Sequence, residues 1–459
     1  MLNRFRSRPF LLSVLVIWAL KLLGLFLSTP LYDLDTNSYI RGGFTWDIYH
    51  NPFMNLFIAS LGKVWSNAWF IVSVQCLLYA LAGAFLVEVL GEGKERRWRW
   101  ALLGVVCLEP LTGFYNYSLL AESAFTSFTL VTVGAGILYL RAPSRGRALL
   151  FGLGLGLTFL CKLSALIHLP LFLLFLFRGP FLRRSVPMGL WALLPFAACY
   201  AFVYFGQQAM NGGDLFTVEG RVRWDFSSAL YDHGEVEGPA FKAYVHPYIY
   251  ADGQLEPHRE RRREMSYLGY KDCVAAYEAR GWSVNRGINA CDSLFGAVAA
   301  QVMERHFWAA ERQFIADNFR FVHSLNYIDY RFTPGLHYYH PASEWRYLDS
   351  LMATHFGVDL SENSDRIPGI WTNLSFGNVY MPMVWWAWWI FLLLGLWLWW
   401  RDRGRWDLLV LTGLTAIPLV FHFVYISYRP RFLAPYLVLV WSLGLMILQR
   451  LNEHARQRT

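Results

Sequence analysis

Asp33 and Asp35 lie two residues apart in a polar stretch that directly follows the first apolar run of the chain. A carboxylate that is partly desolvated at a membrane surface can serve as a general base. Alternatively, the pair could hold a divalent cation, because hard cations take carboxylate oxygens. A third interpretation is that both acidic side chains only keep the loop hydrated and have no further role. Spacing alone leaves the three interpretations open.

Four further charged residues lie next to apolar runs. Glu122 lies near the start of one run, Lys162 lies between two short runs, and Arg429 and Arg431 precede the last one. Charges close to hydrocarbon are costly and indicate function by default. Cations at headgroup depth are natural partners of a lipid phosphate, which Arg can bind through two hydrogen bonds. The alternative for each cation is interfacial snorkelling.

The composition predicts that a lipid bilayer surrounds the elements that position these residues. Of the 459 residues, 55% are hydrophobic and only 16% are charged, and the mean hydropathy is +0.29. A soluble chain carries charge on about a quarter of its residues. The formal net charge of +8 is concentrated in loops beside apolar runs. We therefore expect the bilayer as a partner and no nucleic acid.

The apolar runs predict an all-α polytopic membrane protein with about ten transmembrane helices. The runs cover residues 10–27, 68–90, 101–114, 119–140, 149–160, 163–177, 188–205, 383–400, 408–425 and 432–448. Basic residues occur in every second connection, which predicts that both termini are cytoplasmic. On this topology Glu122, Lys162 and the first loop all lie on the outer face.

Three parts follow from this topology. Residues 1–207 form an N-terminal transmembrane module with its first outer loop at 28–67. Residues 208–382 form a large extracytoplasmic segment of helical and irregular structure. Residues 383–459 contain the C-terminal transmembrane helices and a cytoplasmic tail.

The outer segment contains a helix signal and two cysteines. Trp308, Ile315, Phe319 and Val322 lie on one face of a predicted amphipathic helix. Cys273 and Cys291 can form a disulfide if the segment faces an oxidising compartment.

Several short motifs occur in a specific order along the chain. They are Asp35 with Tyr39, His50-Asn-Pro52, Leu119-Leu-Ala-Glu-Ser123, Lys162, and Tyr428-Arg-Pro-Arg-Phe432. Together they resemble the GT-C superfamily of integral membrane glycosyltransferases, which use polyprenyl-phosphate-linked sugars. The likeness covers roughly the first 180 residues and the last 80, and it does not include the segment 208–382. The acidic motif here is Asp-Thr, not Asp-Glu, which leaves the base open between Asp35 and Asp33.

The resemblance implies an inverting glycosyltransferase in the cell membrane, which is the inner membrane in a bacterium. Asp35 or Asp33 would deprotonate the acceptor hydroxyl. The implied roles of the other residues are donor-phosphate binding for Lys162, Arg429 and Arg431, and sugar or acceptor binding for Glu122, Tyr39 and His50. No cofactor is required by this scheme, and a divalent cation on Asp33 and Asp35 stays an alternative.

The expected partners are a polyprenyl-phosphate-linked sugar and an acceptor glycan, lipid or surface protein. Two other classes of protein compete with the enzyme. A lipid-linked glycan flippase needs polar residues at mid-membrane depth and broken helices. A non-catalytic scaffold would only display the outer segment.

Overall fold

The described part of the protein is almost entirely helical. A computed structural model describes residues 8–28, 30, 36, 39–40, 51–169, 182–210, 239–244, 246–251, 254–255, 259–322, 350, 352–354, 356, 375–402, 406–421 and 430–456. Within these ranges the only strands are β1 (Tyr250–Ala251) and β2 (Gln254–Leu255), an antiparallel pair with Tyr250 opposite Leu255. The predicted all-α class is confirmed for the described residues.

Six helices of the described part are long and apolar enough to cross a membrane. They are α2 (Arg8–Ser28), α5 (Ala68–Leu90), α8 (Ala121–Arg141), α11 (Leu182–Met210), α20 (Ser375–Arg401) and α22 (Pro430–Arg456). Two shorter apolar helices are α4 (Phe53–Val64) and α21 (Trp406–Phe421). These helices support the prediction of a polytopic membrane protein.

Helix α8 is the centre of the bundle. It packs against α5, α21, α22 and α9 (Arg145–Cys161). Nearly all of its side chains are buried. The polar residues of α8 are tolerated in this position because their hydroxyls bond to backbone carbonyls of the same helix, as Thr126 does to Glu122 at 2.7 Å.

Residues 101–114, expected to form one span, belong to two helices. Helix α6 (Arg96–Leu108) ends before Glu109, and α7 (Pro110–Asn116) begins after it. The Glu109 carboxylate caps α7 by accepting hydrogen bonds from the amides of Leu111 (3.2 Å) and Thr112 (2.5 Å). Pro110 at the first helical position needs no such partner, because proline has no amide hydrogen. The prediction of a single helix was therefore wrong here.

The predicted spans 149–160 and 163–177 differ in outcome. Residues 149–160 lie in α9, which extends to Arg145 and Cys161. Residues 163–168 form the 3-10 helix η1 (Leu163–His168). Most of the remainder of the predicted span 163–177 lies outside the described residues.

The described part of residues 208–382 consists mainly of a helical hairpin. Helices α15 (Arg259–Glu278) and α16 (Val284–Val322) pack together, with α13 (Pro239–Tyr244) and α14 (His246–Ile249) against α15. Cys273 and Cys291 form a disulfide across the hairpin, with their Cα atoms 6.2 Å apart. The helix predicted from Trp308 and its neighbours is confirmed in α16. On α14, Tyr248 donates a hydrogen bond to Asp272, which raises the pKa of Tyr248.

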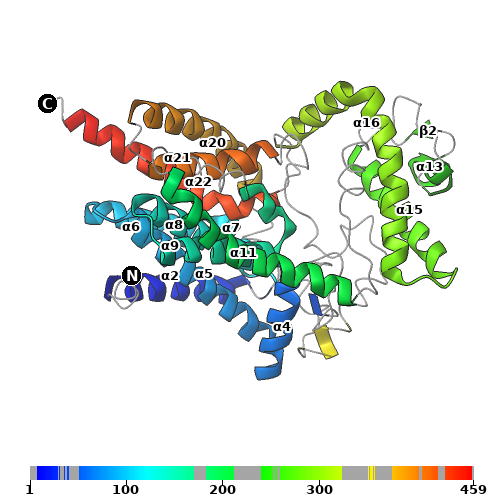
Figure 1. Ribbon diagram of the computed structural model, residues 1–459, viewed down its shortest axis with the longest axis horizontal. Coiled ribbons are helices and arrows are strands. Elements are labelled where there is room, and N and C mark those ends of the chain that lie inside the picture. Colours follow the sequence, from blue (N-terminus) through cyan, green and yellow to red (C-terminus); the bar gives the residue numbers. More distant parts are fainter. Residues whose placement is uncertain are drawn as a thin grey trace.

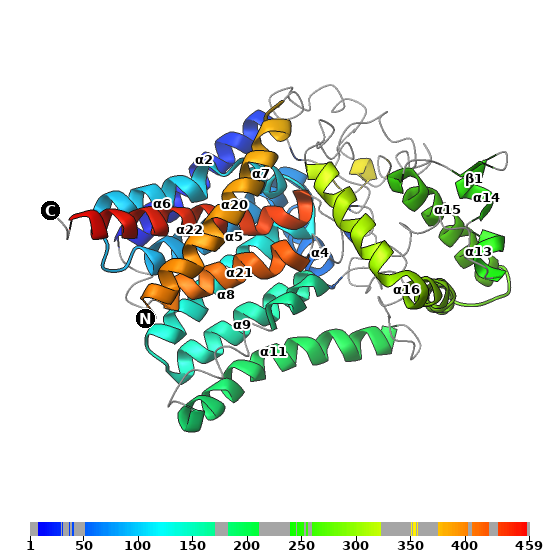
Figure 2. The same ribbon diagram turned by 90° about the horizontal axis from the view of Figure 1, so that it is seen from above.

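The two ends of the bundle differ in what they carry. Helix α22 ends, and the N-terminal helix α2 begins, at one end, which we call the terminal end (Figures 1 and 2). Helices α13–α16 lie beyond the opposite end, which we call the far end (Figures 1 and 2). This arrangement separates the chain termini from the large polar segment.

Ion pairs join several predicted basic loops at the terminal end. Arg141, the last residue of α8, pairs with Glu92 at 3.3 Å and with Asp407 at 3.7 Å. Arg456 near the C-terminus pairs with Glu95 at 3.4 Å. The connections after α5, α8 and α20 and the end of α22 therefore meet at this end.

Glycines allow α9 to approach two neighbouring helices closely. A Cβ atom at Gly152 would overlap the carbonyl oxygen of Ala192 in α11. A Cβ atom at Gly156 would lie 2.7 Å from the Cys199 sulfur in α11, and one at Gly154 would lie 2.8 Å from Thr132 Oγ1 in α8. Small residues serve this purpose in membrane helix pairs.

We expect Gly152→Leu to destabilise the protein, because the obstacle is backbone and cannot rotate away. Overpacking of this kind costs about 1–3 kcal/mol or more. The measurement is the free energy of unfolding in detergent. Gly104→Leu in α6 is the matched control, because a Cβ atom there meets nothing within 4 Å. A Gly152→Leu protein as stable as this control would contradict the close packing of α9 on α11.

Candidate functional site

Glu122 and Lys162 form a buried ion pair at the far end of the bundle. The distance from Lys162 Nζ to Glu122 Oε1 is 2.5 Å. The Glu122 side chain is completely buried, whereas 16% of the Lys162 side chain is exposed. The pair thus presents one partly accessible ammonium group, held by a carboxylate that solvent does not reach.

The α8–α9 hairpin explains why these two residues meet. Glu122 lies in the first turn of α8, and Lys162 directly follows the last residue of α9. The two helices are antiparallel and joined by a short turn at residues 142–144. The start of α8 and the end of α9 therefore reach the same end, roughly 30 Å from the turn, since α8 has 21 residues.

Described residues of the loop 28–67 contact the segments that carry Glu122 and Lys162. Thr36 donates a hydrogen bond from Oγ1 to the Leu119 carbonyl at 3.2 Å, three residues before Glu122. Asn51 donates from its side-chain amide to the Phe159 carbonyl, three residues before Lys162. Thr36 and Asn51 thus attach this loop beside the ion pair at two points.

Tyr39 belongs to the same packing. Its side chain is buried in one apolar cluster with Leu119, Leu120 and Ala121, the residues that lead into α8. A tyrosine packed in this way fixes the loop to the start of α8. Asp33, Asp35 and His50 lie outside the described residues.

The start of α22 also lies at the far end. The Ala434 carbonyl accepts a hydrogen bond from Thr112 Oγ1 of α7 at 2.9 Å. Tyr436 Oη and His168 Nε2 of η1 are 3.3 Å apart. Arg431 belongs to the first turn of α22, although its side chain and the whole of Arg429 lie outside the described residues. The segment that carries Arg431 is thus tied to η1, which begins directly after Lys162.

Two further buried ionisable residues, Lys21 and Glu109, have no role assigned from the sequence. Lys21 of α2 is 2% exposed and donates to the Cys107 carbonyl at 3.1 Å, and its ammonium lies 5.2 Å from the ring centre of Tyr79. Glu109 is 3% exposed and accepts a hydrogen bond from Tyr380 Oη at 2.7 Å. The sequence signals for these residues were a lone lysine in an apolar run and a glutamate directly before a proline.

The far end presents a partly exposed ammonium group, that of Lys162, whose charge is paired with the Glu122 carboxylate. The Lys162 ammonium is partly exposed and next to apolar helices, where a charge-assisted hydrogen bond to a phosphate oxygen is stronger than in water. Among the described residues, no group of three or more His, Cys, Asp or Glu side chains is arranged to hold a metal ion.

Comparison of the chain with protein-family models, with curated proteins and with solved structures found no match.

Proposed function

We propose that the protein is a glycosyltransferase of the GT-C type. It transfers a sugar from a polyprenyl phosphate to an acceptor hydroxyl on the outer face of the membrane. One observation carries the proposal: the segments that bear the family-like motifs converge at the far end of the bundle. Thr36 and Asn51 of the first loop bond to the residues beside Glu122 and Lys162, and these two form an ion pair.

The proposed topology has about ten spans, both termini in the cytoplasm, and residues 208–382 outside. Two observations support it. The basic connections meet at the terminal end, and helices α13–α16 lie beyond the far end (Figures 1 and 2). In a bacterium the membrane is the inner membrane, where positively charged loops stay in the cytoplasm.

The proposed reaction is a single displacement with inversion at the anomeric carbon. Asp35 removes the proton of the acceptor hydroxyl as its oxygen forms the new bond to the sugar. The bond between the anomeric carbon and the phosphate oxygen breaks, and polyprenyl phosphate leaves as an anion. Lys162, with Arg429 and Arg431, stabilises the leaving phosphate in a poorly hydrated site.

Glu122 is assigned a positioning role in this scheme. Its buried carboxylate holds the Lys162 ammonium at the end of α9. Tyr39 and His50 contribute to the sugar or acceptor side, on the loop that carries Asp35. Asp33 is the alternative base, and Asp33 with Asp35 could hold a divalent cation. The acceptor is a lipid, a polysaccharide or a surface protein.

A lipid-linked glycan flippase is the second candidate. The observation that favours it is the break between α6 and α7 at Glu109, together with the buried Lys21. Broken helices and buried charges line the substrate paths of many transporters.

One reconstitution experiment separates these functions. Purified protein in vesicles receives a labelled polyprenyl-phosphate sugar, and membranes from a deletion strain supply acceptors. We expect the label to move to an acceptor without ATP. Movement of intact donor across the bilayer with no bond cleavage would instead establish the flippase. If the label neither transfers nor crosses the bilayer with any pentose or hexose donor, both proposals fail and the scaffold is favoured.

A further inference from the structure

The break between α6 and α7 lies inside the bundle, at the depth of hydrocarbon on the proposed topology. Lys21 and Tyr79 both contact it, and they lie seven residues before the end of α2 and eleven residues after the start of α5. At about 1.5 Å per residue, the break is roughly 10–16 Å from the far end. Backbone groups at this depth need partners within the protein, because lipid supplies none.

The last carbonyls of α6 receive their partners from neighbouring helices. Tyr79 Oη of α5 donates a hydrogen bond to the Val106 carbonyl at 2.8 Å. Lys21 Nζ of α2 donates to the Cys107 carbonyl at 3.1 Å. The carbonyl end of a helix is the negative end of its dipole, so a buried ammonium group is favourable there. The end of α6 is thus bound to both α2 and α5.

The start of α7 carries the opposite charge. Glu109 caps this helix start, which is the positive end of the dipole. The opposite charges of Lys21 and Glu109 attract each other across the break. Tyr380 Oη of α20 donates to Glu109 at 2.7 Å and accepts a hydrogen bond from Trp441 of α22 at 3.0 Å. Glu109 therefore also connects α7 to α20 and α22.

The position of α7 determines the position of the start of α8. The connection between the two helices has only four residues. Asn116 Oδ1 at the end of α7 accepts a hydrogen bond from Ser123 Oγ of α8 at 3.1 Å. Gln75 of α5 donates to the Ser118 carbonyl within the connection at 2.9 Å. Glu122 lies in this first turn of α8, so a shift of α7 would move the ion pair of the proposed site.

Stability alone does not account for two buried charges at the break. Well-packed apolar side chains in place of buried opposite charges often leave a protein equally stable or make it more stable. Access of a substrate does not account for them either, because Lys21, Glu109 and Tyr79 are all buried. Each charge is instead directed at one particular helix end, which favours a role in fixing the geometry of the break.

We propose that Lys21 and Glu109 are positioning residues for the transfer reaction. They hold α7, and through it the ion pair of Glu122 and Lys162, in the geometry that receives the donor phosphate. This inference rests on the proposed function. Both residues act through α7 and not by contact with the substrate. A displacement of about 1 Å in a group that binds the reacting atoms can lower the rate about 10²-fold.

The test measures kcat and the KM for the polyprenyl-phosphate sugar with the reconstituted full-length protein, per mole of folded protein. Lys21→Met should raise the donor KM about tenfold and lower kcat/KM about 10²-fold, because the phosphate is bound less well in the ground state and in the transition state. A variant that only loses folded protein would show a lower maximal rate with an unchanged KM. The KM therefore separates positioning from folding.

Two further variants keep the test decisive. The double variant Lys21→Met with Glu109→Gln removes both charges, so part of the stability should return while the donor KM stays raised. Tyr79→Phe is the variant for the case that Lys21→Met does not fold. It removes only the hydrogen bond to the Val106 carbonyl and should raise the donor KM by a smaller factor.

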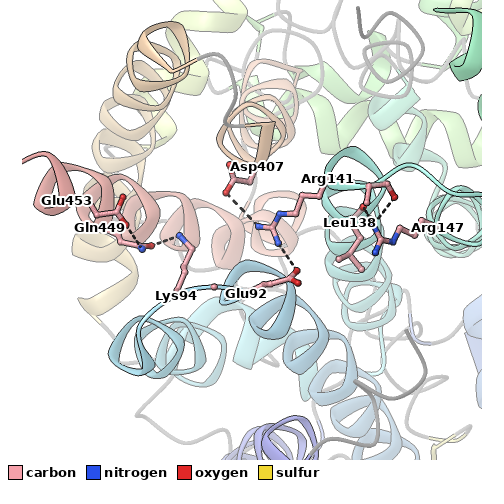
Figure 3. A pocket seen from close by; sticks show the side chains of 10 residues that line it. Glu92, Lys94, Leu138, Arg141, Arg147, Asp407, Gln449 and Glu453 are labelled. Atoms are coloured by element: carbon pink, nitrogen blue, oxygen red, sulfur yellow. Dashed lines mark hydrogen bonds and ion pairs between the residues drawn. The ribbon is translucent and has the colours of Figure 1, made fainter. Parts of the chain in front are cut away.

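Arg141→Met is the matched control. Arg141 holds the opposite end of α8 through Glu92 at 3.3 Å and Asp407 at 3.7 Å (Figure 3). This variant also removes one cation from the packing of the helices, but at the terminal end. It should lower the stability and leave the donor KM at the wild-type value.

The outcomes separate this inference from the proposed function. If the wild type transfers no sugar, the proposed function fails, and the inference fails with it. If the wild type transfers sugar and the folded Lys21 variants keep its donor KM, only the inference is overturned. A wild-type KM in the double variant, or an equal rise of KM in Arg141→Met, would likewise show that the buried charges act on folding alone.

Discussion

Replacing Lys162 by methionine is expected to lower the rate of sugar transfer about 10²–10³-fold. Loss of one preorganised group that stabilises a developing negative charge has an effect of this size. Among the described residues at the far end, Lys162 is a cation that is partly exposed and held in place by an ion pair. The rate is measured with the reconstituted protein and a saturating donor.

The same substitution should also destabilise the protein. Without Lys162, the completely buried carboxylate of Glu122 loses its ion pair. Removal of one partner of a buried pair costs about 3–5 kcal/mol. The loss of activity in a single variant would therefore mix an effect on chemistry with an effect on folding.

The double variant Glu122→Gln with Lys162→Met separates the two effects. It removes both charges, so most of the stability should return while transfer stays low. Lys94→Met is a control at the terminal end, where Lys94 donates a hydrogen bond to Gln449, and it should keep full activity. Recovery of transfer in the double variant would show that Lys162 acts only on folding.

The second large effect is expected from Asp35→Asn. An asparagine has the same shape but cannot accept the proton of the acceptor hydroxyl. We expect transfer to fall about 10²–10⁴-fold, the usual contribution of a general base. The measurement is the envelope composition, by mass spectrometry, of a deletion strain that is complemented with the wild type or with the variant. A sugar mass missing from both the deletion strain and the Asp35→Asn strain would name the sugar and the acceptor together.

Asp33→Asn tests the alternatives that remain for this pair. If Asp35 is the base, Asp33→Asn should retain most of the transfer activity. If the two carboxylates hold a divalent cation, both variants should fail, and excess Mg²⁺ or Mn²⁺ should restore part of the activity. If Asp35→Asn restores every envelope product at a normal protein level, a residue other than Asp35 is the general base.

Much of the fold follows from the sequence because lipid imposes a simple rule. A segment that crosses hydrocarbon must be helical, long and apolar. The runs at residues 68–90 and 119–140 therefore predicted α5 and α8 almost to the residue. The helical spacing of Trp308 and Val322 likewise predicted a helix in the outer segment, which lies in α16.

Local breaks in helices were harder to predict. The apolar residues around Glu109 form a continuous run, and hydropathy does not record whether a carboxylate points outward or caps a new helix. The combination of Glu109 with Pro110 is a helix-start signal. The apolar run alone predicts one helix over residues 101–114, whereas the structure has α6 and α7.

The sequence by itself determined the class of protein, the positions of most helices and the residues to suspect. Only the tertiary structure decided which of these residues meet. Glu122 and Lys162 are 40 positions apart, and their ion pair depends on the antiparallel packing of α8 and α9. Lys21 and Cys107 meet across α2 and α6, and Arg147 reaches the end of α8, for the same reason. Hydropathy and helical periodicity are local properties of the chain, whereas the choice of neighbouring helix depends on side-chain shape and on glycines such as Gly152.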